Sequence, residues 1–479
     1  MGRKRVDILL IVALFVFSLV LRLIFMNAAL WHHDSVQFAI STENTLETGR
    51  LHGLGGGKEG MILITTVFYG LAKIFGARNA EYTVTFVTIL FAAGSVSLMY
   101  IFTRQLMPGR LAAFASGFML SVSPIFLANT TYAKSHAFSV FFQLLSAIIL
   151  IRAIRTDRKA YQVLAGFFLM VSFFMRAENI LLLLPFAVMA FCWRRQKTLP
   201  LFQLSALAFF TCVFFAFSYG EFMHSAGYNS YAVQLDSFIL PIKWLYLSMT
   251  FVGFLLLLLG LLTESNKNLV PLFAWFAVFF FYFSIVRSSS PRFFIPCLIP
   301  VFIICSRGIL TISRRYFRTA ILILVLVSSL MIISIYPVIS YRHENSGQKA
   351  LGDLLRSATE PGAKVLIMAD DYIFVEYYGN RTPINCYPNE LRDRYSEIVS
   401  MVYNGTPVYY FENCLYLFGQ KDVNVPYELN TRLRNRFIFE EVGPPIQYEE
   451  YHKTSVSLKN ANFTLYRLVP RNVSVVYLN

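Results

Sequence analysis

Several ionisable side chains of this sequence stand directly beside long apolar segments. Asp34 comes just after the first apolar run, and Arg176 and Glu178 separate two later ones. Charges at such places are costly in a membrane and indicate a functional site by default. A carboxylate such as Asp34 can act as a general base, and a guanidinium such as Arg176 can bind a phosphate group.

Other candidate binding residues fall in the same set of connecting segments. They are His33, Lys58, Lys134, His136, Arg287 and Arg292. Any one of the cations is explained equally well by a long side chain that reaches lipid headgroups. Their convergence on one side of the membrane carries more information, because a group of cations there suits the phosphate of a lipid-linked molecule.

Asp34 also has an ordinary structural explanation. An aspartate followed three residues later by Gln37 is the pattern of a helix N-cap with a capping box, and a capping carboxylate can still face a cavity. His32 and His33 are adjacent, so they point in different directions in a helix or a strand. We therefore assign no metal ligands, and a divalent cation stays open.

The composition predicts a polytopic α-helical membrane protein. Of the 479 residues 56% are hydrophobic and 14% charged, and the mean hydropathy is +0.55. Apolar runs of about 18 or more residues recur, long enough to cross the hydrocarbon core. The predicted spans, about eleven, are 7–26, 81–103, 111–128, 135–151, 161–175, 179–193, 200–219, 241–262, 270–286, 291–306 and 319–337. A large soluble protein does not contain such runs.

The basic residues predict the orientation. The net charge is +15, and most of the cations form short clusters between apolar runs, as in cytoplasmic loops. This distribution does not indicate a nucleic-acid partner. All the clusters fall on the side of Arg3–Arg5, which places the N-terminus in the cytoplasm of a plasma-membrane protein. Residues 61–76 are too short for a span and predict an interfacial or re-entrant helix in a long first outer loop, 27–80.

The C-terminal tail has a different composition. Polar residues become more frequent after Pro337, and short strands alternate with helices, which predicts a small α/β domain. We therefore divide the chain into a transmembrane domain, 1–338, and an extracytoplasmic domain, 339–479. Cys386 and Cys414 both fall in this tail, and whether they pair stays open.

The order of these features resembles the glycosyltransferase C (GT-C) superfamily, specifically its protein O-mannosyltransferase-like and aminoarabinose-transferase-like members. The resemblance covers roughly residues 5–310. It is carried by Trp31–Asp34, the segment 61–76, Tyr100–Arg104, Thr131–Ala137, Phe173–Leu181 and Ser290–Pro296. The family usually has two adjacent acids where this chain has His33-Asp34. The Trp-Trp-Asp-Tyr-Gly motif of oligosaccharyltransferases is absent, so transfer of a whole oligosaccharide is not expected.

The resemblance implies a membrane glycosyltransferase that uses a polyprenyl-phosphate sugar donor. Asp34 would take the proton of an acceptor hydroxyl while that oxygen attacks the anomeric carbon, with inversion. Arg292, Arg176 and Lys134 would stabilise the departing phosphate. The acceptor is a protein, a lipid or a glycan.

Two other classes of protein remain open. A lipid or solute transporter fits the spans, although such proteins often show internal repeats that we do not find here. A scaffold with the same fold and no activity also fits, because the second acid is missing.

Overall fold

The computed structural model describes residues 3–30, 32–53, 58–156, 158–193, 236–263, 269–285, 291–367, 372–385, 388–411, 431–451 and 458–471. The chain divides into two compact units. The first consists of residues 1–27 and 38–343, and the second of residues 28–37 and 344–479. Each unit is described here by itself.

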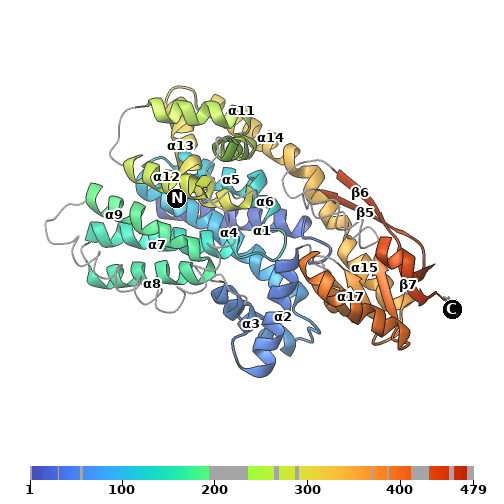
Figure 1. The fold of residues 1–479 in the computed structure, drawn as a ribbon. Coiled ribbons are helices and arrows are strands. Elements are labelled where there is room, and N and C mark those ends of the chain that lie inside the picture. The colour runs from blue at the N-terminus through green and yellow to red at the C-terminus, as the bar shows by residue number, and fades with distance from the viewer. Residues whose placement is uncertain are drawn as a thin grey trace, which may run out of the picture. The chain divides into compact units, whose positions relative to one another are not determined.

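The first unit is helical throughout its described part (Figure 1). Its elements are α1 (Arg3–Ile24), most of α2 (His33–Thr48), α3 (Glu59–Ile74), α4 (Glu81–Leu106), α5 (Arg110–Val122), α6 (Pro124–Ala128), α7 (His136–Thr156), α8 (Lys159–Met175), η1 (Ala177–Leu182), α9 (Leu183–Cys192), α11 (Asp236–Leu262), α12 (Leu269–Ile285), η2 (Pro291–Phe294), α13 (Ile295–Ser313) and α14 (Phe317–Glu344).

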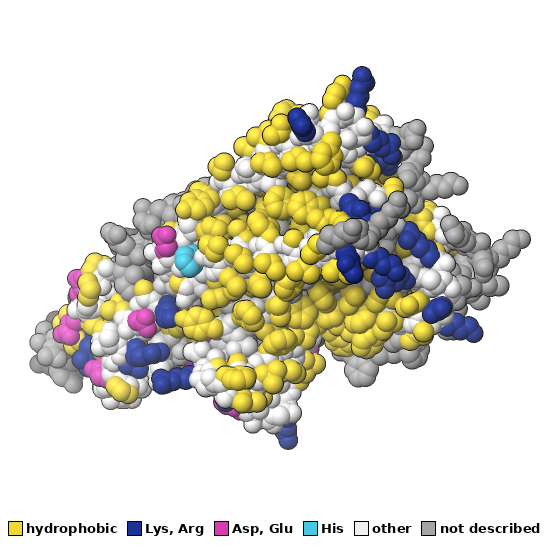
Figure 2. Space-filling model, turned by 180° about the vertical axis from the view of Figure 1, so that it is seen from behind, with side chains coloured by type: hydrophobic (Ala, Val, Ile, Leu, Met, Phe, Trp, Pro, Cys, Tyr) yellow, Lys and Arg dark blue, Asp and Glu magenta, His cyan; other side chains and the backbone are white. Residues whose placement is uncertain are grey.

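Six segments in the described residues are long and apolar enough to cross a membrane. They are Lys4–Ile24, Glu81–Leu106, His136–Thr156, Pro241–Leu262, Pro291–Ser313 and Phe317–Ala358. Shorter apolar helices cover Arg110–Val122, Lys159–Met175, Ala177–Cys192 and Leu269–Ile285. Figure 2 shows a broad face of hydrophobic side chains, as a surface in contact with lipid requires. The chain is thus a polytopic helical membrane protein. The span predicted at 200–219 lies outside the described residues.

Proline and glycine set the corners that lead to α6 and α7. Helix α4 ends just before Pro108, as expected because a residue that precedes proline avoids the helical conformation. Helix α5 starts after the extended Gly109, and α6 starts with Pro124 in its first turn, where the missing N–H costs nothing. The turn that carries Lys134 follows α6 and leads into α7.

Helix α3 occupies the segment expected to form a short helix between spans. Its 16 residues measure about 24 Å, less than the hydrocarbon thickness. It packs closely on the end of α8. A Cβ atom on Gly60 would lie 2.5 Å from Met175 Cε and 3.0 Å from the Phe174 carbonyl oxygen. Glycine is therefore required for this approach, which holds α3 against the residues just before Arg176.

The second unit contains a five-stranded sheet in the order β2-β1-β3-β7-β4. Its elements are α15 (Gly347–Ala358), β1 (Lys364–Ile367), α16 (Tyr372–Tyr377), β2 (Thr382–Asn385), α17 (Pro388–Tyr403), β3 (Val408–Phe411), β4 (Phe437–Glu441), β5 (Ile446–Tyr451), β6 (Leu458–Phe463) and β7 (Leu465–Pro470). Strands β1, β2 and β3 are parallel, and β7 is antiparallel to β3 and β4. Strands β5 and β6 form a separate antiparallel pair.

Both faces of β3 are covered. Val408 and Tyr410 pack with residues of α17, whereas Tyr409 and Phe411 pack with residues of α15. A strand buried on both sides is apolar without alternation, as the sequence Val-Tyr-Tyr-Phe is. This unit also includes residues 28–37, where the Leu30 N–H donates to Tyr378 Oη at 2.9 Å.

One contact in this unit predicts a dependence of stability on pH. The Tyr409 hydroxyl donates to Glu360, whose carboxylate also lies 3.3 Å from Arg467 Nη2. The bond from Tyr409 holds the pKa of Glu360 below its usual value, and burial together with Glu360 raises the pKa of Tyr409 to about 12. The contact should therefore stabilise the fold between roughly pH 5 and 10, the ordinary values of the two groups. It should weaken as pH falls through the pKa of Glu360 or rises toward that of Tyr409.

Tyr409→Phe should accordingly cost about 0.5–1 kcal/mol at pH 7, because the carboxylate is partly exposed. The difference from wild type should shrink below pH 4 and above pH 11. Urea unfolding of the full chain at each pH measures this difference in the free energy of unfolding. The unfolded fraction is read by a hydrogen-exchange pulse on the β3 amides, always at the same pulse pH. An equal difference at every pH would rule out this origin.

Candidate functional site

Arg176 stands at a break between two helices. Helix α8 ends at Met175, Arg176 is extended with φ −161° and ψ 123°, and the 3-10 turn η1 follows. The Arg176 N–H donates to the Ser172 carbonyl at 3.1 Å, and its carbonyl accepts from Asn179 N at 3.1 Å. The break turns the side chain away from the helix axis and brings Glu178 to the same side.

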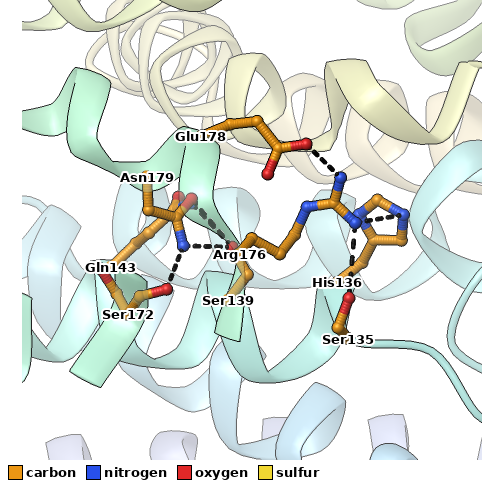
Figure 3. Close-up of polar contacts among 8 residues, drawn as sticks. All are labelled: Ser135, His136, Ser139, Gln143, Ser172, Arg176, Glu178 and Asn179. Atoms are coloured by element: carbon orange, nitrogen blue, oxygen red, sulfur yellow. Dashed lines mark hydrogen bonds and ion pairs between the residues drawn. The ribbon is translucent and has the colours of Figure 1, made fainter. Parts of the chain in front are cut away.

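A buried network of side chains fixes this turn. The Asn179 amide nitrogen donates to the Ser172 carbonyl at 2.7 Å and to Ser139 Oγ at 2.8 Å. Gln143 Nε2 donates to Asn179 Oδ1 at 2.6 Å. Asn179, Ser139, Gln143 and Ser172 are at most 1% exposed. This network ties η1 to both α7 and α8 (Figure 3). Breaking it would leave polar groups unpaired in an apolar interior, which is costly.

The Arg176 guanidinium contacts residues from two other parts of the chain. Its Nη2 lies 2.7 Å from Glu178 Oε1. Its Nη1 lies 3.4 Å from both Ser135 Oγ and His136 Nε2 (Figure 3). A guanidinium can only donate, so a hydrogen bond here requires His136 Nε2 as the acceptor.

An aromatic ring joins Arg176 to a second arginine. The guanidinium carbons of Arg176 and Arg292 each lie 5.3 Å from the centre of the Phe293 ring. His136 meets the same ring edge-on at 6.2 Å. The side chains of Arg176 and Glu178 are 11% and 21% exposed, so the group is largely shielded from water yet still reachable. Two arginines and His136 thus meet at the Phe293 ring, and the Ser135 hydroxyl lies 3.4 Å from Arg176. Such an arrangement suits an anion.

Of the remaining predicted cations, the structure describes Lys134 and Lys58. Lys134 belongs to the turn before α7 and is 2% exposed, next in sequence to Ser135 and His136. Lys58 precedes α3, and its Nζ lies 5.8 Å from the centre of the Phe38 ring. Arg287 lies outside the described residues. The structure therefore brings together His136, Arg176, Glu178 and Arg292 of the predicted set.

Asp34 lies in the first turn of α2, and its side chain is 15% exposed. The expectation that Asp34 is the N-cap is wrong. The His32 carbonyl accepts from Val36 N at 3.3 Å, which makes His32 the capping residue, and His32 Nδ1 accepts from Asp34 N at 3.1 Å. Since Nδ1 accepts the hydrogen bond from Asp34 N–H, Nδ1 carries no proton, and its 3.7 Å contact with Asp34 Oδ2 is not an ion pair. His32 therefore caps α2, which the sequence pattern did not predict, and Asp34 does not have the capping role.

His33 is the first residue of α2, and its side chain lies outside the described part. Residues 33–37 belong to the second unit, whereas the Arg176 group belongs to the first. In the described ranges we find no group of three or more histidine, cysteine, aspartate or glutamate side chains that could hold a metal ion.

Sequence analysis missed several residues of this region. Phe293 was recorded only as part of a motif, and Asn179, Ser139 and Gln143 were not singled out. A polar side chain inside an apolar span was the available signal, since such residues must find partners. The contact of one ring with two arginines had no such signal.

The comparisons with known proteins agree with this organisation. Residues 63–219 match the family model described as dolichyl-phosphate-mannose-protein mannosyltransferase. No curated protein sequence matches the chain.

Solved structures match over nearly the whole chain. ArnT from Cupriavidus metallidurans bound to undecaprenyl phosphate has a TM-score of 0.63 at 11% identity, over 95% of this chain and 97% of that one. The oligosaccharyltransferase AglB from Archaeoglobus fulgidus, in complex with an inhibitory peptide and a dolichol-phosphate, has a TM-score of 0.60 at 10% identity, over 94% and 74%. Its structure with Zn and sulfate has a TM-score of 0.58 at 12% identity, over 94% and 73%.

These matches confirm the resemblance to the GT-C superfamily. The chain has the fold of GT-C membrane glycosyltransferases.

Proposed function

We propose that the protein transfers a single sugar from a polyprenyl-phosphate donor to an acceptor hydroxyl with inversion at the anomeric carbon. The observation that carries this proposal is the group formed by Arg176, Arg292, His136 and Ser135 around Phe293. It lies on a fold whose other members were solved with undecaprenyl phosphate and with a dolichol-phosphate.

Arg176 is already paired with a carboxylate, which bears on how a phosphate would bind. Nη2 is held by Glu178 at 2.7 Å, whereas the contacts of Nη1 with Ser135 and His136 are long, at 3.4 Å. A phosphate oxygen can therefore replace the weak contacts at Nη1 without displacing Glu178. In this role Glu178 fixes the direction of the guanidinium and reduces the net positive charge of the site.

The proposed reaction is one displacement. The acceptor oxygen attacks the anomeric carbon, the bond from that carbon to the phosphate oxygen breaks, and both electrons of this bond leave with the lipid phosphate. Asp34 takes the acceptor's proton and later passes it to water. A phosphate is a good leaving group, so no general acid is needed, and the arginines stabilise the charge that it gains.

The finer assignments belong to the same proposal. Asp34 is the base, and His33, Lys58, Lys134, His136, Glu178 and Arg287 join the two arginines in binding substrate. The N-terminus is cytoplasmic in the plasma membrane, about eleven spans follow, and the domain 339–479 lies outside. AglB was solved with zinc. Among the described side chains, His32 and Asp34 are too few ligands for a typical site, so no step here uses a metal.

Incubation of the purified protein in liposomes with radiolabelled polyprenyl-phosphate sugars and endogenous membrane acceptors tests the function. We expect transfer from one donor of the panel, with the opposite anomeric configuration in the product by NMR. Retained configuration would contradict single displacement. Movement of labelled donor between leaflets without transfer would instead identify a transporter, and neither event by folded protein would favour a scaffold.

A further inference from the structure

A charged side chain that the proposed reaction does not use is fully buried in the last turn of α1. Arg22 has no exposed surface. Its Nε donates to Thr130 Oγ1 at 2.8 Å, and its Nη1 donates to Ser18 Oγ at 2.6 Å. The remaining nitrogen, Nη2, is buried and has no hydrogen-bond partner among the described residues. One side of a buried guanidinium is therefore unused.

The charge of Arg22 is not matched by a carboxylate. Within the described ranges no aspartate or glutamate forms an ion pair with it. The Phe126 ring, 5.0 Å from the guanidinium carbon, and the C-terminal end of α1 offset part of this charge. A buried cation without a counter-ion is nevertheless strongly unfavourable. An ionisable residue inside a membrane domain indicates a functional site by default.

A second buried donor group lies shortly after the end of α1. Asn27 is 4% exposed, its N–H donates to the Thr131 carbonyl at 3.1 Å, and its Oδ1 accepts from Thr131 Oγ1 at 3.3 Å. Its Nδ2 is buried and has no partner. Arg22 and Asn27 thus bind the neighbouring residues Thr130 and Thr131. In each of them one buried NH2 group, Nη2 or Nδ2, makes no hydrogen bond to the described residues.

A second buried cation contacts this segment from α14. Arg342 is 6% exposed, and its Nη1 donates to the Ala128 carbonyl at 3.1 Å. Its guanidinium carbon lies 5.7 Å from the centre of the Tyr132 ring. Residues 126–132 are therefore surrounded by two arginines and an asparagine, which supply donors and positive charge.

We propose that Arg22 and Asn27, supported by the charge of Arg342, bind the oxyanion of a phosphate group. A guanidinium with an unused edge suits phosphate oxygens, and a tetrahedral anion accepts hydrogen bonds from several directions. This second anion site uses side chains different from those of the Arg176 group, so it does not depend on the proposed reaction. The phosphate is carried by a membrane lipid or is free in solution.

Native mass spectrometry and thermal unfolding of the full-length, delipidated protein in neutral detergent test this site. The probes are dioleoyl phosphatidylglycerol and inorganic phosphate, with dioleoylglycerol and equal ionic strength of sodium chloride as phosphate-free controls. Wild type should retain and be stabilised by one of the two probes, which identifies the source of the phosphate. Apparent affinity should fall at least tenfold in Arg22→Gln and several-fold in Asn27→Ala. This Arg22-dependent binding should persist in Arg176→Gln, which removes the other proposed anion site.

Equal binding by wild type and Arg22→Gln would overturn the proposal. So would a wild type that binds neither probe, whether Arg22→Gln unfolds at a higher or a lower temperature. If Arg22→Gln does not fold, probe binding is measured for Arg22→Lys and Asn27→Ala instead. Wild-type binding by both variants would overturn the proposed phosphate site.

Discussion

Replacing Arg176 by glutamine is expected to weaken binding of undecaprenyl phosphate at least tenfold and to lower the rate of sugar transfer by about a hundredfold. A hydrogen bond to a charged group contributes roughly 1.5–3 kcal/mol, and about 1.4 kcal/mol corresponds to a tenfold change. The rate should suffer further because charge develops on the phosphate as the bond breaks, where one lost donor costs about 10²–10³. Equilibrium binding to the solubilised protein and initial transfer rates measure the two effects.

Two further variants separate a phosphate contact from a structural ion pair. Arg315→Gln removes an exposed arginine that lies over Tyr316, and it should change neither quantity. Glu178→Gln removes the partner at 2.7 Å but leaves the cation, so binding of the lipid phosphate should be kept or strengthened. If Glu178→Gln lost as much binding as Arg176→Gln, the pair would be structural and Arg176 would not be the phosphate ligand.

Asn179→Leu is expected to have the second large effect, on both stability and binding. The substitution keeps the number and branching of the side-chain heavy atoms. It removes the acceptor of one Gln143 Nε2 N–H and the donor to Ser139 Oγ and the Ser172 carbonyl, whereas Gln143 Nε2 still donates to Ser139 Oγ at 3.0 Å. Unsatisfied buried groups cost roughly 1–3 kcal/mol each, and hydrogen bonds within membrane domains are weaker than this on average, so we expect a loss of about 2–3 kcal/mol. Thermal unfolding in detergent measures the stability.

The network is a positioning device, so its loss should also reach the site. At a temperature where the variant is folded, binding of undecaprenyl phosphate should fall several-fold because η1 no longer holds Arg176. Asn44→Leu is the matched control: in the described structure its side-chain amide makes no hydrogen bond, and a change within about 0.5 kcal/mol is expected. Reduced stability with unchanged binding would show that the network supports the fold and not the site.

Features that depend on local sequence could be predicted. The apolar runs predicted helices because the hydrocarbon thickness sets their length, and ten of the predicted spans coincide with apolar helices in the described residues. The pairing of Arg176 with Glu178 was also within reach, because the two residues are only two positions apart.

Features that depend on tertiary packing could not be predicted in this way. Nothing near Phe293 in the sequence indicates that Arg176, more than a hundred residues earlier, lies against its ring. The capping pattern at Asp34 misled because the helix starts two residues earlier than a cap at Asp34 requires, and the His32 ring accepts from the Asp34 N–H. Arg22 was overlooked as well, although a charge within the first apolar run is visible in the sequence; only its burial without a counter-ion gives it meaning.

The most direct test of the central claim is a comparison of sugar transfer by wild type and Asp34→Asn from a panel of radiolabelled polyprenyl-phosphate sugars. Asparagine keeps the size of the side chain but cannot take a proton, so transfer should fall by about 10²–10⁴ while binding of undecaprenyl phosphate stays within about twofold. Transfer by Asp34→Asn at the wild-type rate would contradict the account, because Asp34 would then not be the base.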